Sequence, residues 1–207
     1  MDNKYKSIEG IIFDWFGVCT EKWIDVWERE LKNKVETTLL RSSFFKYLDK
    51  YANNSSTGQE FLENVFSELN LNYKGYEYLL EKHGEVNHRL LGNICKLKKK
   101  YKIALLSDNF NDMIPVIKKD IGGFDKYFDV VVLSNELNVG KIENKIYETT
   151  LSRLGLEGNS CVFIDDKEKN LVLARTFGIK TILYENNVLL EKDLSELGIV
   201  YDVKQLE

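Results

Sequence analysis

Short apolar runs that end in polar residues alternate with amphipathic stretches in the second half of the chain. Four such runs are separated by three segments with helical spacing. The runs cover 103–108, 129–134, 161–166 and 180–184, and the helical segments cover 111–119, 144–154 and 170–177. Uninterrupted apolar runs are typical of strands buried on both faces, and their alternation with helices indicates a parallel sheet. We therefore expect a doubly wound, Rossmann-like α/β core.

A fifth apolar run, Ile11-Ile12-Phe13-Asp14, stands near the start of the chain and is bounded by Gly10 and Gly17. It predicts another buried strand, and this strand ends in a carboxylate. Open α/β sheets bind their ligands at the carboxyl ends of the strands, so Asp14 is a candidate functional residue. A helix cap or a turn former is the structural alternative for such an acid.

The residues between these two regions follow a helical rhythm instead. A first amphipathic pattern starts at Trp23, a second covers 40–51, and a fourth, longer one extends over 79–97. Thr57 with Glu60 forms a capping-box signature at the start of the third. We expect these stretches to form an all-helical insertion of about four helices after the first strand.

Composition narrows the classes of protein and of partner. The chain has 207 residues, of which 43% are hydrophobic and 30% charged, with one proline, as in an ordinary globular protein. The net charge of −4 gives no footprint for nucleic acid or an anionic membrane, and no apolar run approaches the ~20 residues of a membrane span. Cys19, Cys95 and Cys161 fit no metal-ligand spacing, and no signal peptide is recognised, so we expect reduced thiols in the cytoplasm. Nothing in the sequence indicates the oligomeric state.

Three of the expected strands end in acids, at Asp14, at Ser107-Asp108 and at Asp165-Asp166. The carboxyl ends of parallel strands meet at one edge of the sheet, so these side chains are expected to converge. Carboxylates a few ångströms apart repel one another, and a divalent cation with oxygen ligands relieves that repulsion. Mg²⁺ is the expected ion, because it binds one or two carboxylates together with phosphate oxygens.

Lys141 follows Gly140 and precedes an expected helix, so it would add a positive charge at the same edge. Ser107 offers a hydroxyl beside the start of a helix, where backbone N–H groups favour an anion. Carboxylates, a cation, a hydroxyl and a lysine together indicate phosphoryl transfer. The alternatives are a salt bridge for Lys141 and helix caps for Asp165 or Asp166.

These residues, in this order, resemble the four motifs of the haloacid dehalogenase-like hydrolase superfamily. The matching segments are Asp14-x-Phe16-Gly17-Val18, Leu106-Ser107, Lys141 and Phe163-Ile164-Asp165-Asp166-x-x-x-Asn170. The long helical insertion after the first motif suits the helical cap of that family. The resemblance implies a core of residues 1–18 and 99–207 and a helical cap of residues 19–98.

The resemblance also implies a role for each matching residue. Asp14 would be the nucleophile and form an aspartyl-phosphate. The phosphoryl group would be bound by Ser107, Asp108, Asn109 and Lys141. Mg²⁺ would be bound by Asp14, the backbone carbonyl of Phe16 and Asp166. Asp165 would be a further ligand, directly or through water, and Asn170 an outer orienting residue.

The sequence departs from the family's phosphatases at Phe16, where they usually carry a second aspartate that protonates the leaving group. Loss of such an acid typically lowers the rate by ~10²–10⁴-fold. The leading prediction is Mg²⁺-dependent hydrolysis of a small phosphate monoester, slowed by this replacement. The alternatives are a module that binds phosphate and Mg²⁺ with little turnover, and a 2-haloacid dehalogenase in which Arg41 pairs with the substrate carboxylate. The Asp165-Asp166 pair argues against the dehalogenase, because it would repel a haloacid.

Overall fold

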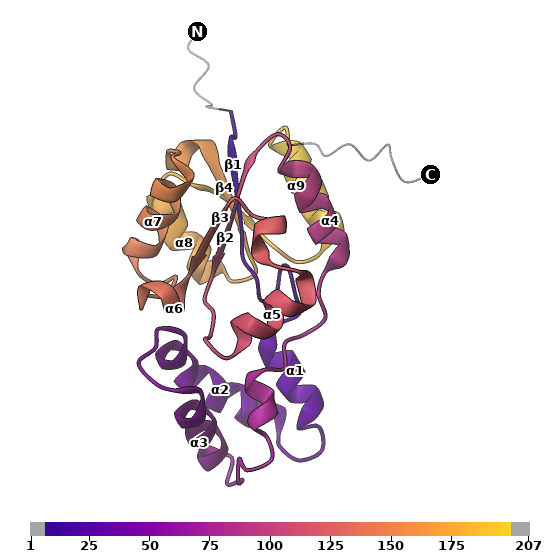
Figure 1. Cartoon of the computed structure of the whole chain (residues 1–207), viewed down its shortest axis with the longest axis vertical. Coiled ribbons are helices and arrows are strands. Elements are labelled where there is room, and N and C mark those ends of the chain that lie inside the picture. Colours follow the sequence, from indigo (N-terminus) through magenta and orange to yellow (C-terminus); the bar gives the residue numbers. More distant parts are fainter. Residues whose placement is uncertain (1–6, 200–207) are drawn as a thin grey trace.

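Five parallel strands form one sheet in the order β3-β2-β1-β4-β5 in a computed structural model that describes residues 7–199 (Figure 1). The strands are β1 (Gly10–Phe13), β2 (Lys102–Ser107), β3 (Val130–Leu133), β4 (Cys161–Asp165) and β5 (Lys180–Leu183). The helices are α1 (Trp23–Glu30), α2 (Thr37–Ala52), α3 (Gly58–Glu68), α4 (His88–Leu97), α5 (Met113–Ile121), α6 (Ser134–Leu137), α7 (Asn144–Leu154), α8 (Glu168–Thr176) and α9 (Asn187–Glu196). The expected doubly wound α/β fold is confirmed.

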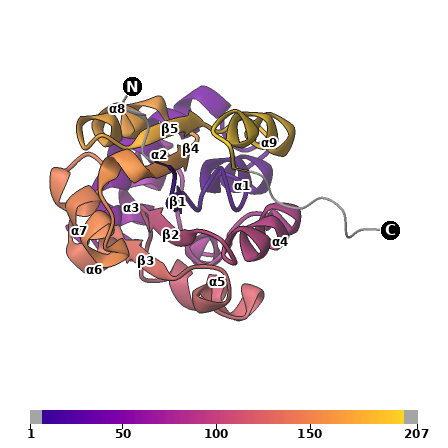
Figure 2. The same ribbon diagram turned by 90° about the horizontal axis from the view of Figure 1, so that it is seen from above.

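The central strand β1 is buried on both faces, as its apolar sequence predicts. Successive side chains of a strand point to opposite faces. Ile12 packs in the cluster formed with α7 and α8, whereas Ile11 and Phe13 pack in the cluster that includes α4, α5 and α9. Figure 2 shows these two groups of helices on either side of the sheet. Helices therefore cover both faces of the sheet, and the carboxyl end of β1 is the part of this strand that a ligand can approach.

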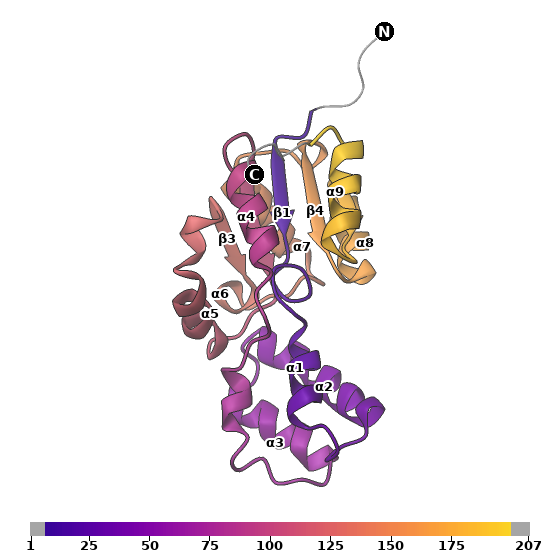
Figure 3. The same cartoon turned by 90° about the vertical axis from the view of Figure 1, so that its right-hand side faces the viewer.

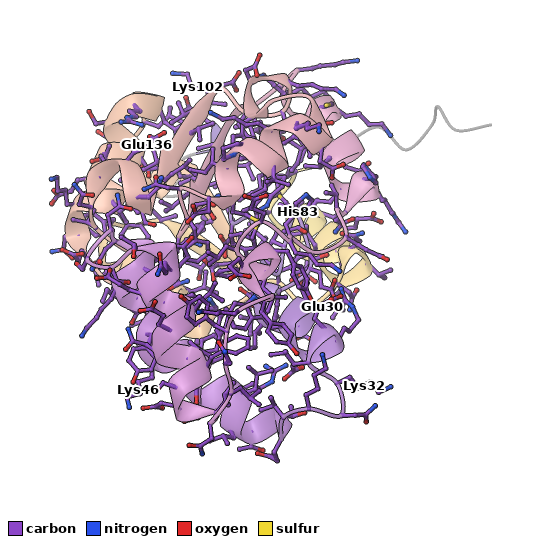
Figure 4. The ribbon with its side chains drawn as sticks, turned by 60° about the horizontal axis from the view of Figure 1, so that its bottom comes forward. Glu30, Lys32, Lys46, His83, Lys102 and Glu136 are labelled. Atoms are coloured by element: carbon purple, nitrogen blue, oxygen red, sulfur yellow. The ribbon has the colours of Figure 1, made fainter. Side chains whose placement is uncertain are left out.

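Helices α1–α3 and the short 3-10 turn Glu77–Leu80 lie beyond the carboxyl end of the sheet as a separate layer, which we call the cap (Figures 1 and 3). Aromatic rings fill it: Trp27 packs edge-on against Phe44 and Phe61. The capping box predicted for α3 is confirmed, since Thr57 N–H donates to Glu60 at 2.7 Å and Glu60 N–H donates to the Thr57 hydroxyl at 3.2 Å. In Figure 4 the labelled charged side chains Glu30, Lys32 and Lys46 project from the outer surface of the cap.

The single helix expected over 79–97 is wrong. The structure has the turn Glu77–Leu80, then a non-helical segment, then α4. In that segment Val86 pairs in an antiparallel bridge with Thr20. The two connections between core and cap, one at Thr20 and one at Val86, therefore lie side by side. The apolar face of α4 packs on the sheet rather than in the cap, and α4 lies beside α9 (Figure 2). We therefore place the end of the cap near residue 86 rather than at residue 98.

The cap rests directly on the core through the end of α2. Tyr51 stacks on Phe110, with ring centroids 4.8 Å apart, and Ser134 donates a hydrogen bond of 2.7 Å to the carbonyl of Ala52.

All three cysteines are free thiols. No helix among residues 7–199 is both long enough and apolar enough to cross a bilayer.

Candidate active site

Asp14 is held at the edge of the sheet by the backbone that follows β1. Its N–H donates to the carbonyl of Ile164 at 2.9 Å, which continues the pairing of β1 with β4. The carboxylate is almost fully buried, and its Oδ1 accepts a 2.6 Å hydrogen bond from Trp15 N–H. Oδ1 also lies 2.5 Å from Lys141 Nζ. Oδ2 makes neither of these two contacts.

The predicted convergence of acids is present in the structure. Carboxylate oxygens of Asp14, Asp165 and Asp166 all lie within 4.8 Å of one another, although Asp14 directly follows β1 and the other two stand at the end of β4 and directly after it. Lys141 lies between two of them, with Nζ 2.5 Å from Asp14 and 2.8 Å from Asp165. It is 1% exposed, so both ion pairs, which the sequence analysis gave as the alternative for this lysine, lie inside the acid cluster itself.

Asp165 is fully engaged by the protein itself. Both of its oxygens accept hydrogen bonds from Asn170 Nδ2 at 3.0 Å; Oδ1 also accepts from Lys167 N–H, and Oδ2 from Lys141. A carboxylate with this many donors is suited to orienting Lys141. We therefore propose that Asp165 positions the lysine, whereas the resemblance implied that it binds the metal. Asn170 acts on Asp165 in the way expected of an outer orienting residue.

Asp166 differs sharply from its neighbour. Its side chain is 3% exposed, yet within residues 7–199 neither of its oxygens accepts a hydrogen bond. Lys22 Nζ, from the residue before α1, lies 2.8 Å from Oδ2 outside hydrogen-bonding geometry. Buried charge without hydrogen bonds is costly, so this carboxylate is suited to a cation ligand. The donor set, oxygen atoms of closely spaced carboxylates, fits Mg²⁺.

Gly17 allows Asp166 to approach so closely. Its φ of +85° lies in the region that favours glycine, and a Cβ there would stand 2.6 Å from Asp166 Cγ. The glycine of the first motif is therefore required by both its backbone conformation and the carboxylate that packs against it.

Burial and like charge dominate the electrostatics of the site. Burial raises the pKa of Asp14 from its ordinary 3.8 to about 8, because Lys141 only partly offsets the loss of water and the added repulsion of Asp165 and Asp166. Burial alone would lower the pKa of Lys141, but Asp14 and Asp165 outweigh it and raise that pKa well above its ordinary value. Burial likewise acts to raise the pKa of Asp165, but Lys141 and Asn170 hold it below its ordinary value. The lysine is thus charged, and a bound cation would favour the charged form of Asp14.

The predicted phosphate-binding residues at the end of β2 are only partly open to a substrate. Asp108 lines the pocket beside Asp14, and its Oδ1 accepts a 3.0 Å hydrogen bond from Lys141 N–H. Ser107 and Asn109 are 0% exposed and are absent from the pocket lining. The Ser107 hydroxyl donates to the carbonyl of Asp108 at 3.1 Å. In this structure the two residues differ from the expectation that they face the phosphate.

A pocket of about 330 Å³ opens over Asp14 between the core and the cap. The core contributes charged groups from the strand ends, and α1 and α2 contribute apolar side chains. The lining consists of Asp14, Phe16, Lys22, Trp23, Ile24, Phe44, Phe45, Leu48, Asp49, Ala52, Asp108, Phe110, Lys141, Asp166, Lys167 and Lys169. Phe16 thus faces the pocket, and its ring lies 5.8 Å from that of Phe110 and 6.5 Å from that of Trp23.

One residue of the site was not predicted from the sequence, and one candidate is excluded from it. Tyr147 was missed as a site residue; its hydroxyl lies 2.9 Å from the carbonyl of Lys141 and 3.0 Å from that of Asn170. A tyrosine on the buried face of a helix needs a hydrogen-bond partner, so the position of Tyr147 on the apolar face of 144–154 could have marked it as a site residue. Arg41 is bound instead by Asp25 at 2.7 Å and Glu28 at 2.5 Å and does not line the pocket.

Fold and site together define an α/β protein with a buried carboxylate, Asp14, and a cluster of acids at the carboxyl end of its central strand. The sequence profile of the haloacid dehalogenase-like hydrolases matches residues 8–178. The chain therefore belongs to the haloacid dehalogenase-like hydrolases.

Curated relatives are similar over limited segments. Flavin mononucleotide hydrolase 1 of Arabidopsis thaliana is 38% identical over 66 residues, 32% of this chain and 27% of that protein. Bifunctional epoxide hydrolase 2 of Rattus norvegicus is 27% identical over 116 residues, 54% of this chain and 21% of that protein. The chain thus matches only about a quarter of the length of these relatives.

Solved structures resemble the chain over nearly its whole length. A haloacid dehalogenase-family enzyme of Bacteroides thetaiotaomicron, in complex with magnesium and inorganic phosphate, has a TM-score of 0.65 at 21% identity and covers 89% of this chain and 99% of its own. L-2-haloacid dehalogenase of Xanthobacter autotrophicus, with chloropropionic acid covalently bound, has a TM-score of 0.65 at 18% identity, with 93% and 84% covered. At these identities the similarity establishes the fold alone.

Proposed function

We propose that this chain hydrolyses a small phosphate monoester in a Mg²⁺-dependent reaction, through an aspartyl-phosphate on Asp14. The observation that supports it best is the contrast within the acid pair: Asp165 is satisfied by the protein, whereas the buried Asp166 is left without a hydrogen bond among the described residues. Mg²⁺ would be held by Asp14, Asp166 and the backbone carbonyl of Phe16, and when bound it would neutralise charge on the phosphoryl group and its attacking oxygen.

The protein's own residues provide nucleophile and charge. Lys141 and Trp15 N–H hold Oδ1 of Asp14, which leaves Oδ2 as the oxygen suited to attack phosphorus. The bond between phosphorus and the alcohol oxygen breaks, and the departing alkoxide takes a proton from water. A second water then hydrolyses the acyl phosphate to release phosphate and restore the Asp14 carboxylate. Lys141 keeps its charge throughout and stabilises the negative charge that develops beside it.

A screen of phosphate esters with and without Mg²⁺, comparing the parent chain with Asp14→Asn, tests this proposal. We expect Mg²⁺-dependent phosphate release that falls by at least ~10³-fold in Asp14→Asn, because the variant lacks the nucleophile. Asp120→Asn, an exposed acid outside the pocket, serves as the matched control and should retain the parent rate. Activity that survives in Asp14→Asn would contradict the mechanism.

A second candidate function is a module that binds phosphate and Mg²⁺ with little or no turnover. The ring of Phe16 favours it, because a phenyl group on the pocket wall transfers no proton. Binding of beryllium fluoride with Mg²⁺, without phosphate release from any ester, is the result that would select this function over the first.

A further inference from the structure

We propose that the substrate is a phosphate monoester of a compact apolar alcohol, with its hydrocarbon part against the cap. This inference rests on the proposed function and specifies its substrate class. It follows from the division of the pocket, which places charged groups of the core around Asp14 and hydrocarbon on the opposite wall.

The cap wall of the pocket is a row of apolar side chains on one helix. Phe44, Phe45, Leu48 and Ala52 of α2 recur at helical spacing and line the pocket together. Phe45 is 44% exposed, so its ring has apolar surface that a ligand in the pocket would remove from water. Removal of such surface from water favours binding of a hydrocarbon group.

The wall beside the nucleophile is apolar as well. Phe16, Trp23 and Phe110 line it, and the rings of Trp23 and Phe110 are 4.6 Å apart. The polar atom of Trp23 is already engaged, since Nε1 donates to the carbonyl of Leu79 at 3.1 Å. Its ring therefore contributes hydrocarbon surface alone. Phe16 thus continues the apolar wall up to the position where the family's phosphatases place a second carboxylate.

Polar partners for the alcohol part of a substrate are few. Among the described residues, Asp49 is the one charged or polar side chain that α2 contributes to the lining. None of the lysines in the lining belongs to α2: Lys22 precedes α1, Lys141 and Lys167 lie in core loops, and Lys169 lies in the first turn of α8. A sugar phosphate would bury several hydroxyl groups against phenyl rings and leave them without hydrogen bonds, which is costly. The volume of about 330 Å³ is at the small end of ligand pockets, which favours a compact alcohol.

Three primary-alcohol esters test the inference, because a shared kind of leaving group isolates recognition from reactivity. We expect kcat/KM for 2-phenylethyl phosphate to exceed that for glycerol 3-phosphate and glucose 6-phosphate by at least ~10-fold. Phe45→Gln should reduce this preference by at least ~3-fold, because it replaces the exposed ring with an amide. Leu39→Gln, which changes an exposed apolar residue of the same helix outside the pocket, should leave the preference unchanged.

The outcomes separate this inference from the proposed function. Hydrolysis of all three esters without preference, or with preference for glucose 6-phosphate, overturns the inference and leaves the proposed function standing. If none is hydrolysed, the proposed function fails, and binding of two phosphonates decides the inference by calorimetry. Tighter binding of 2-phenylethylphosphonate than of methylphosphonate, lost in Phe45→Gln, would support the apolar site, and equal binding of the two would overturn it.

Discussion

Phe16 affects both the proposed reaction and the selectivity of the pocket. It stands two residues after Asp14, the proposed nucleophile, and packs among the rings of Trp23 and Phe110. A carboxylate in its place would supply a proton donor but would interrupt the apolar wall. The two effects act on different kinetic constants and can be measured separately.

Phe16→Asp is therefore expected to raise kcat for an alkyl phosphate by at least ~10-fold, because a positioned acid/base typically contributes ~10²–10⁴-fold. The KM for 2-phenylethyl phosphate should rise in the same variant, because a carboxylate replaces apolar surface. Steady-state kinetics with Mg²⁺ measure both, and Phe16→Asn, which transfers no proton, is the matched control. An unchanged or lower kcat would mean that another carboxylate, with Asp49 and Asp108 both lining the pocket, already performs the transfer.

The sequence predicted the placement of Asp14, Lys141, Asp165 and Asp166, because parallel strands bring their carboxyl ends to one edge. Both adjacent acids were expected to serve the metal, whereas their hydrogen bonds differ: Asp165 accepts from the protein, and within residues 7–199 Asp166 accepts none. That difference depends on Lys167 N–H and Asn170, whose directions are set by the turn into α8. Such directions follow from tertiary geometry, which strand and helix periodicity do not encode.

At the scale of elements, strong local signals were predicted and weak ones were not. Helix α7 begins and ends at the residues that the pattern indicated, because Asn144–Leu154 has regular apolar spacing and Gly155 follows it in a left-handed conformation. The pattern over 79–97 was misinterpreted as one helix. Apolar residues on both sides of Gly84 keep the same helical spacing, although the chain between Leu80 and His88 is not helical. Helix α9 was not predicted, although the side chain of Asn186 accepts hydrogen bonds from the N–H groups of Val188 and Leu189 and marks its start.

The capping box of α3 gives a prediction about stability. Thr57→Ala should lower the free energy of unfolding by about 1 kcal/mol, because the Glu60 N–H loses its acceptor at the exposed start of the helix. Urea unfolding followed by circular dichroism measures the change. Thr57→Ser keeps the hydroxyl and should stay within about 0.5 kcal/mol of the parent chain. Equal stability of the alanine variant and the parent would show that solvent replaces the cap at no cost.

At the scale of the whole molecule, the acid cluster links folding to metal and to pH. Burial raises the pKa of Asp14 in the folded chain from its ordinary 3.8 to about 8, so the folded chain binds more protons than the unfolded chain between these values. The contribution of Asp14 to stability therefore falls as the pH rises from about 4 to about 8. The lowered pKa of Asp165 acts with the opposite sign, but below its ordinary value of 3.8.

Mg²⁺ should consequently stabilise the protein more at pH 8.5 than at pH 6, because it competes with the proton on Asp14 at the lower pH. Saturation at about 100 times the dissociation constant corresponds to about 2.7 kcal/mol of added stability. Calorimetric melting with and without Mg²⁺ at the two pH values measures it. Asp166→Asn should shrink the stabilisation at both, and an equal Mg²⁺ effect at pH 6 and pH 8.5 would contradict the assignment to Asp14.

The ion pair between Lys22 and Asp166 links the cap to the core. Lys22 precedes α1 and Asp166 follows β4, so a divalent ion bound by this carboxylate would compete with the lysine for it. By thermodynamic reciprocity, an interaction that keeps Lys22 on Asp166 would weaken the binding of the ion by the same factor. The released ammonium group would remain in the lining of the pocket that also contains Asp14, where it could pair with a phosphate dianion. Lys22 would thus govern the order in which ion and ester bind, because it would exchange Asp166 for the phosphate group of the ester.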